Sequence, residues 1–75
     1  MRVVFELDDR RDVVAVDRWQ PETTLGELIN AVMRLDLPDE AVVYVDGTST
    51  QAATRLEQVT LLEGTLISEK PLPAV

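Results

Sequence analysis

The sequence predicts a small α+β domain in which one helix packs against a mixed sheet of four to five strands. Residues 2–7 carry large apolar side chains at every second position, which is the period of a half-buried strand. Residues 24–35 combine a helix-capping signal with an apolar stripe. Asp46-Gly47 and Gly64 place turns around two further apolar segments. The 75 residues suffice for one domain with a small core.

The N-terminal segment predicts a β-hairpin. Residues 8–12 (Asp-Asp-Arg-Arg-Asp) are too highly charged to be buried and are interpreted as the hairpin loop. Residues 13–16 are rich in β-branched side chains, so we expect them to return antiparallel to the first strand. Alternation places Val3, Phe5 and Leu7 on one face of the first strand. If Val14 and Val16 point inward in the second strand, the same alternation puts Arg18 inward and not Trp19.

A helix is predicted over residues 24–35. Thr24 and Glu27 form a capping box, in which each side chain accepts a hydrogen bond from the backbone amide of the other residue. Leu37 precedes Pro38, and a residue before proline avoids the α region, so the helix should end by this point. One apolar stripe follows the helical spacing of three and four, with Leu25, Leu28, Ile29, Val32 and Leu35.

The C-terminal half predicts two or three strands. Residues 41–45 form a strand with Val43 and Val45 inward, and any strand within the small, polar residues 48–54 should be short and at the sheet edge. Residues 55–60 are interpreted as one irregular turn that places Leu56 and Leu61 in the core. Gly64 is expected to adopt a positive φ before a final strand over residues 65–69.

These elements resemble the ubiquitin family over residues 1–69. The shared features are the V-x-F start of the first strand, residues 21–25 leading into the helix, and Asp46-Gly47 followed by Leu56, Leu61 and Leu66-Ile67. The V-D-G turn followed by L-x-x-x-x-L-x-x-G-x-x-I is similar to the N-terminal ubiquitin-like domains of actinobacterial FtsK/SpoIIIE-type ATPases. It is also similar to the small ubiquitin-like proteins of type VII-like secretion systems. The resemblance implies a ubiquitin-like β-grasp with the strand order 2-1-5-3-4.

The resemblance also implies a protein-binding surface on the outer face of the sheet. In a β-grasp the first, last and third strands lie side by side, and alternation then gives their outward apolar residues as Val4, Val42, Tyr44 and Ile67. The recognition patch of ubiquitin lies on this face, and Tyr44 and Ile67 match two of its positions. A solvent-facing sheet normally carries polar residues there, although valine is also simply a good strand residue.

Charge and composition exclude several kinds of partner. The net charge is −7, and the basic residues are scattered, with only Arg10 and Arg11 adjacent, whereas nucleic acid requires a clustered basic surface. No apolar run approaches the ~18 residues of a membrane span, and residues 1–6 meet charge too early for a signal peptide. We expect no nucleic acid partner, no direct membrane insertion and a cytoplasmic location, at the inner face of the membrane if a parent protein carries the domain there.

Side chains suited to catalysis are scarce. The chain has no His and no Cys, and Ser49 and Ser68 lack an adjacent base. Asp36, Asp39 and Glu40 could hold a hard cation, but a calcium loop needs more oxygen ligands and a turn glycine, so a solvated acidic loop is favoured. We therefore predict a non-enzymatic protein without cofactor or metal.

Two further segments lie outside the predicted helix and strands. Trp19 lies between the second strand and the helix, where it covers the end of the core or anchors a partner; a buried Trp19 requires a bulge at Asp17-Arg18. Residues 70–75 contain two prolines and are interpreted as a linker or tail.

The sequence favours a non-catalytic protein–protein interaction domain, the N-terminal module of a larger ATPase or secretion-system component. The alternative is a free-standing small adaptor or assembly protein. The expected partner is another protein, a neighbouring domain or a second copy of the chain. A modifier or sulfur carrier needs a terminal Gly-Gly whose carboxylate can be adenylated, and this sequence contains no Gly-Gly.

Overall fold

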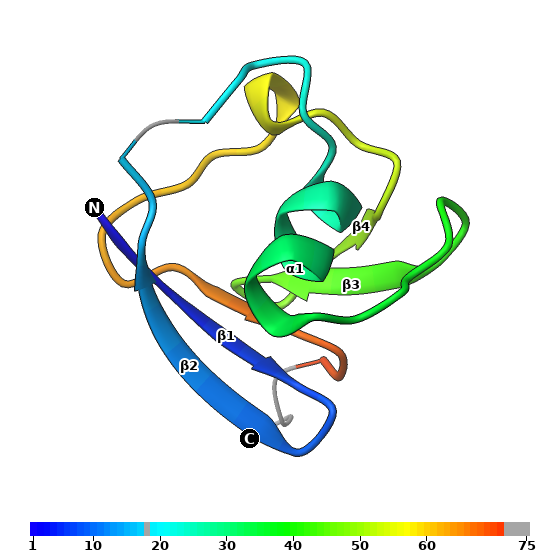
Figure 1. Cartoon of the computed structure of the whole chain (residues 1–75), viewed down its shortest axis with the longest axis horizontal. Helices are drawn as coiled ribbons and strands as arrows, with labels where there is room; N and C mark the ends of the chain where they lie inside the picture. The colour runs from blue at the N-terminus through cyan, green and yellow to red at the C-terminus, as the bar shows by residue number, and fades with distance from the viewer. Residues whose placement is uncertain (18, 72–75) are drawn as a thin grey trace.

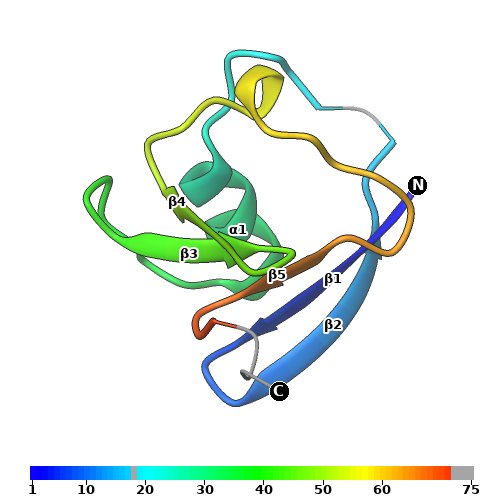
Figure 2. The ribbon, with the colours of Figure 1, turned by 180° about the vertical axis from the view of Figure 1, so that it is seen from behind.

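A computed structural model of the chain describes residues 1–17 and 19–71. One helix packs against a five-stranded mixed sheet in the order β2-β1-β5-β3-β4, which confirms the predicted strand order (Figures 1 and 2). β1 and β5 are parallel, and the other neighbours are antiparallel. The elements are β1 Arg2–Leu7, β2 Arg10–Ala15, α1 Leu25–Met33, β3 Val42–Val45, β4 Thr48–Gln51, the 3-10 helix η1 Leu56–Gln58 and β5 Leu66–Ser68.

The hairpin turn between β1 and β2 is shorter than residues 8–12. Only Asp8 and Asp9 lie in the turn, and their φ angles of 53° and 58° are both left-handed. A two-residue turn with two positive φ angles matches the natural twist of the flanking strands, and aspartate tolerates this conformation. Arg10–Asp12 therefore belong to β2, where their charged side chains remain exposed at the sheet edge.

The helix begins as predicted and ends earlier. The capping box is present, with the Glu27 N–H donating to Thr24 Oγ1 at 3.2 Å and the Thr24 N–H donating to Glu27 Oε1 at 3.4 Å. α1 ends at Met33, because Arg34 adopts the left-handed conformation with φ 56° and ψ 47°. Pro38 bars a helix from continuing through its own position and disfavours the α region at Leu37, but it would still allow the helix to extend past Met33, so it does not set this end.

Side chains stabilise the end of α1. The Asn30 amide bonds both backbone groups of Leu37: it accepts from the Leu37 N–H at 2.9 Å and donates to the Leu37 carbonyl at 3.3 Å. The Arg10 guanidinium donates to the Met33 carbonyl, which places a positive charge at the negative end of the helix. The first hairpin is thereby tied to the helix terminus.

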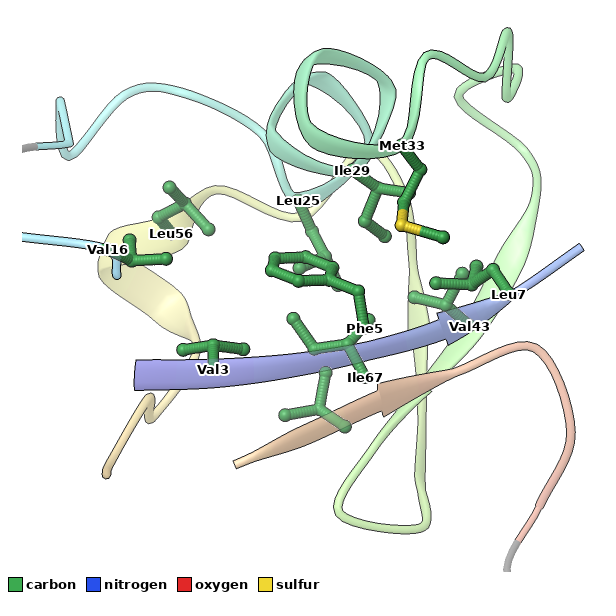
Figure 3. Close-up of a cluster of buried hydrophobic side chains, with 11 residues drawn as sticks. Val3, Phe5, Leu7, Val16, Leu25, Ile29, Met33, Val43, Leu56 and Ile67 are labelled. Atoms are coloured by element: carbon green, nitrogen blue, oxygen red, sulfur yellow. The ribbon is translucent and has the colours of Figure 1, made fainter. Parts of the chain in front are cut away.

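The core lies between α1 and one face of the sheet (Figure 3). Phe5 of β1 points from the sheet toward the helix, and Leu56 of η1 closes one end. Leu61 is only partly buried, in contrast to the expectation of a core position. Fully buried apolar residues include Val3, Phe5, Leu25, Ile29, Met33, Val43, Leu56 and Ile67, while Trp19, Leu28, Val32 and Leu35 pack partly buried against them.

The C-terminal segment follows the predicted course with shorter bounds. Gly64 has a φ of 82°, as predicted, and Thr65 is buried, with its hydroxyl accepting from the Leu62 N–H at 2.9 Å. Of the predicted linker, residues 72–75 lie outside the described part of the chain, as does Arg18 of the expected bulge. Across the described ranges, no helix has the length and apolar character needed to span a membrane.

Candidate functional site: the helix-free face of the sheet

An apolar row crosses three strands on the face opposite the helix, which Figure 2 presents. Val4 of β1 is paired with Val13 of β2 on one side and with Leu66 of β5 on the other. Paired residues in a sheet point to the same face, so the three side chains lie next to one another. Val4 and Leu66 are partly exposed, and Val13 is 57% exposed. We call Val13, Val4 and Leu66 the apolar row.

Tyr44 and Val42 extend this face along β3. Val43 and Val45 are buried, so alternation directs Val42 and Tyr44 outward, as predicted. Tyr44 is partly exposed and Val42 is 46% exposed. The Asp46 N–H donates to the Leu66 carbonyl at 2.7 Å, which aligns Asp46 with the apolar row. Tyr44 is therefore diagonal to Leu66, and Val42 lies further along the same strand.

Ile67 does not belong to this face. It pairs with Phe5 on β1 and with Val45 on β3, both of which are buried, and its own exposed fraction is 0%. The predicted assignment of Ile67 to the binding surface is therefore wrong. Ile67 is a core residue, and its neighbour Leu66 occupies the outward position.

The side chains of β5 face the opposite way from the prediction, and this has a physical cause. Thr65 and Ile67 face the core and Leu66 and Ser68 face outward, although Thr65 is the polar member of the first pair. The Thr65 hydroxyl is satisfied locally by its hydrogen bond with Leu62, so its burial carries no unpaired polar group. Nothing within this short strand distinguishes the two orientations; they are set by the pairing with Phe5 and Val45.

Besides Leu66, the predicted binding surface also lacked Val13. An inward assignment of Val14 implies by alternation that Val13 points outward, so the sequence contained this signal. The pairing of β2 with β1 then places Val13 beside Val4.

Polar residues surround the apolar row. Arg11 lies opposite Glu6 on the same face, and the exposed Arg2 and Glu63 form an ion pair at 3.3 Å. Ser68 is nearly buried and donates to the Lys70 carbonyl at 2.8 Å. An apolar centre with a rim of mixed charge is the arrangement expected of a protein-binding surface.

A hollow adjoins this face where the chain leaves β5. Its volume is about 430 Å³, and Leu66 contributes to its wall. Such a recess beside an exposed apolar row can receive a side chain from a partner. Its lining comprises Glu6, Asp9, Leu66, Ser68, Glu69, Lys70 and Pro71.

Other candidate residues do not assemble into a site. Ser49 is exposed on β4, and Ser68 is engaged with Lys70. Within residues 1–17 and 19–71, no three acidic side chains gather closely enough to hold a metal ion, and this includes Asp36, Asp39 and Glu40. Trp19 is partly buried and packs against the core.

The surface with the strongest physical basis for recognition is thus the apolar row together with Tyr44 and Val42. Its residues come from four of the five strands, and only a folded sheet brings them together. No protein-family model matches the chain, and neither curated proteins nor solved structures include a significant match.

Proposed function

We propose that this chain is a non-catalytic protein–protein interaction domain with a ubiquitin-like β-grasp fold. The single helix and the strand order β2-β1-β5-β3-β4 support this identification of the fold. The partner covers the helix-free face, where Leu66, and not Ile67, is the exposed apolar residue of β5. The binding residues are Val4, Val13, Val42, Tyr44 and Leu66.

The observation that carries this proposal is the exposed apolar character of a solvent-facing sheet. Full burial of one such side chain contributes roughly 1.5–3 kcal/mol, before the cost of association is deducted. Tyr44 is the expected centre, because tyrosine combines a large apolar ring with a hydroxyl that suits a partly hydrated interface. The residues around the apolar row give orientation through their mixed charges.

The larger protein proposed for this domain follows from the sequence resemblance. We propose an N-terminal module of a larger ATPase or secretion-system component, located in the cytoplasm or at the inner face of the membrane. The alternative is a free-standing adaptor or assembly protein of the same fold. Reading the coding sequence downstream of Val75 separates the two: an ATPase region supports the first, and an immediate stop codon supports the second.

A crosslinking experiment tests the proposed surface. A photo-reactive phenylalanine analogue replaces Tyr44 in one variant and Ala31 in another, because Ala31 is exposed on the helix, away from this face. In cells that produce the protein, we expect a defined adduct from position 44 and none of the same mass from position 31.

Binding variants complete the test. Tyr44→Lys and Leu66→Lys should retain the fold, verified by amide NMR spectra, and should lose the crosslinked partner in pull-downs, while Ala31→Lys retains it. Undiminished capture by both folded variants would exclude this face as the binding surface.

A further inference from the structure

The outer edge of β2 has free backbone groups. β2 is an edge strand of the sheet: β1 pairs with one side of it, and among the residues that the structure describes no strand lies along its other side. The Val16 N–H donates to the Met1 carbonyl at 2.8 Å, and antiparallel pairs alternate in hydrogen bonding, so Arg10, Asp12 and Val14 bond to β1. The N–H and C=O groups of the alternate residues Arg11, Val13 and Ala15 therefore point away from the sheet.

The apolar row ends at this same edge. Val13 is its last member and, at 57%, one of the most exposed large apolar side chains of the molecule. The opposite edge of the sheet differs, because β4 (Thr48–Gln51) contains only polar residues. An edge with free hydrogen-bonding groups and an exposed apolar side chain is suited to the addition of another strand.

We propose that a second copy of this chain adds to the β2 edge, with the two β2 strands antiparallel about a two-fold axis at Val13. Val13 of one copy then lies opposite Val13 of the other, Arg11 lies opposite Ala15, and Asp12 lies opposite Val14. Arg11, Val13 and Ala15 are the residues whose backbone N–H and C=O groups point away from β1. Each pair that they form across the axis exchanges two hydrogen bonds. This interface is isologous, as in most dimers.

Charge selects this register among those that keep the two faces of the sheet aligned. A shift to an axis at Asp12 sets two aspartates opposite each other, and a shift to Arg11 sets two arginines opposite each other; both are unfavourable. An axis at Val14 places Arg11 against Asp17, which lies beyond the end of β2 and already holds the Met1 amino group at 2.7 Å. Only the axis at Val13 pairs Arg11, Val13 and Ala15 entirely within β2 and opposes no like charges inside the strand.

The dimer makes one continuous apolar row from two. The sequence of side chains across the joined sheet becomes Leu66, Val4 and Val13 of one copy, then Val13, Val4 and Leu66 of the other. One strand pair buries little surface, so the association is weak and depends on concentration. The inference rests on the backbone edge of β2, and Val13 is the residue that it shares with the proposed binding surface.

Disulfide trapping tests the register. The chain contains no cysteine, so a single introduced thiol reports only on itself. With the axis at Val13, the two Cα atoms of residue 13 are about 5.5 Å apart, within the range that a disulfide spans. The two Cα atoms of residue 15 are offset by four positions, about 13 Å along the strands alone, which is too far for a disulfide. Under mild oxidation we expect a covalent dimer from Val13→Cys and little from Ala15→Cys, a matched variant on the same edge and face.

Sedimentation of proline variants tests the edge itself. Val13→Pro removes an N–H that points away from β1, and Ser49→Pro removes the equivalent outward N–H on β4. The wild type and Ser49→Pro should approach twice the monomer mass of 8.4 kDa as concentration rises, and Val13→Pro should remain monomeric. Val13→Lys should raise the dissociation constant about tenfold or more, because like charges then oppose each other across the axis.

The results separate this inference from the proposed function. Equal disulfide formation by Val13→Cys and Ala15→Cys, or dimerisation of folded Val13→Pro like the wild type, overturns pairing through β2. If the dimer persists in Val13→Pro and is lost in Tyr44→Lys, the second copy occupies the helix-free face instead. If the dimer is lost in Val13→Pro and persists in Tyr44→Lys, the edge and the face act separately.

Discussion

Leu66 and Ile67 are nearly equal in size and hydrophobicity, yet they lie on opposite faces of β5. Ile67 is fixed in the core by Phe5 and Val45, whereas Leu66 borders solvent beside Val4. The chemistry of a side chain therefore does not determine its role here. Its position in the alternation between the two faces of this three-residue strand does.

The stability of alanine variants should reflect this difference. Ile67→Ala should reduce the free energy of unfolding by about 2–5 kcal/mol, the range for a truncated buried aliphatic side chain. Leu66→Ala should cost less than about 1.5 kcal/mol, because its side chain already contacts water. Urea denaturation of both proteins gives the two values. Equal losses, or a larger loss for Leu66→Ala, would show that the orientation of β5 is reversed.

A second residue-scale prediction concerns pH. The Met1 amino group donates to Asp17 Oδ1 at 2.7 Å, and this hydrogen bond raises the pKa of the amino group above its ordinary value of 8.0. Since the folded-state pKa is the higher one, the stabilisation is complete below about pH 8 and is lost as the pH rises through the folded-state pKa. Asp17 is 68% exposed, so the effect is small and is weakened by salt.

The comparison with Asp17→Asn isolates this effect. At low ionic strength the wild type should be more stable than the variant near pH 7, and the difference should shrink as the pH rises above 8 through the folded-state pKa of the amino group. Other groups that titrate over this range do so in both proteins, so they cancel from the difference. A difference that stays constant with pH would mean that the ion pair contributes nothing.

At the scale of elements, α1 is held against the segment after β4 by a close approach at Gly26. The Gly26 N–H donates to the Ala52 carbonyl at 2.8 Å, and both residues are buried. A Cβ at position 26 would lie 2.9 Å from the Ala52 Cβ and 3.2 Å from the Ala52 carbonyl oxygen. Glycine here serves packing between two elements at the expense of helix propensity.

Gly26→Ala should therefore destabilise the protein. Alanine improves helix propensity by about 1 kcal/mol, but overpacking at a backbone contact costs typically 1–3 kcal/mol, and the second effect should dominate. Adding Ala52→Gly removes one of the clashing atoms, so the double variant should recover part of the loss. Thermal denaturation of the three variants measures this coupling. A gain of stability from Gly26→Ala alone would contradict the close packing.

The sequence predicted those element features that depend on local chemistry. The capping box at Thr24 and Glu27, the positive φ of Gly64 and the inward side of β3 all follow from residues within a few positions of one another. The end of α1 did not, because it depends on Asn30 and Arg10 reaching other segments.

The candidate surface was predictable to the same extent. Val4, Val42 and Tyr44 point outward because of alternation within strands that have an unambiguous apolar face. The face of Leu66 is set by pairing with strands about 20 and about 60 positions away, which local pattern cannot reveal.

At the scale of the whole molecule, carrier chemistry can be tested directly. Gly26, Gly47 and Gly64 are the three glycines, and no two are adjacent, so the Gly-Gly that modifiers and sulfur carriers use is missing from all 75 residues. We expect no adenylate and no thioester when the chain is incubated with ATP and an activating enzyme of either type. Intact-mass spectrometry, with ubiquitin as the positive control, detects the adduct. An adduct at the C-terminal carboxylate would replace the interaction-domain proposal with the carrier alternative.

The central place of β5 has a consequence for biosynthesis. β1 and β2 form one hairpin, β3 and β4 form another, and within the sheet only β5 connects the two. A nascent chain that has emerged as far as Gly64 holds both hairpins and the helix, yet the facing edges of β1 and β3 are still open. Such unpaired edges are where chains aggregate or recruit chaperones. The domain therefore closes in one late step, when the three residues Leu66–Ser68 leave the ribosome, and mutations that delay this step should lower yield before they lower stability.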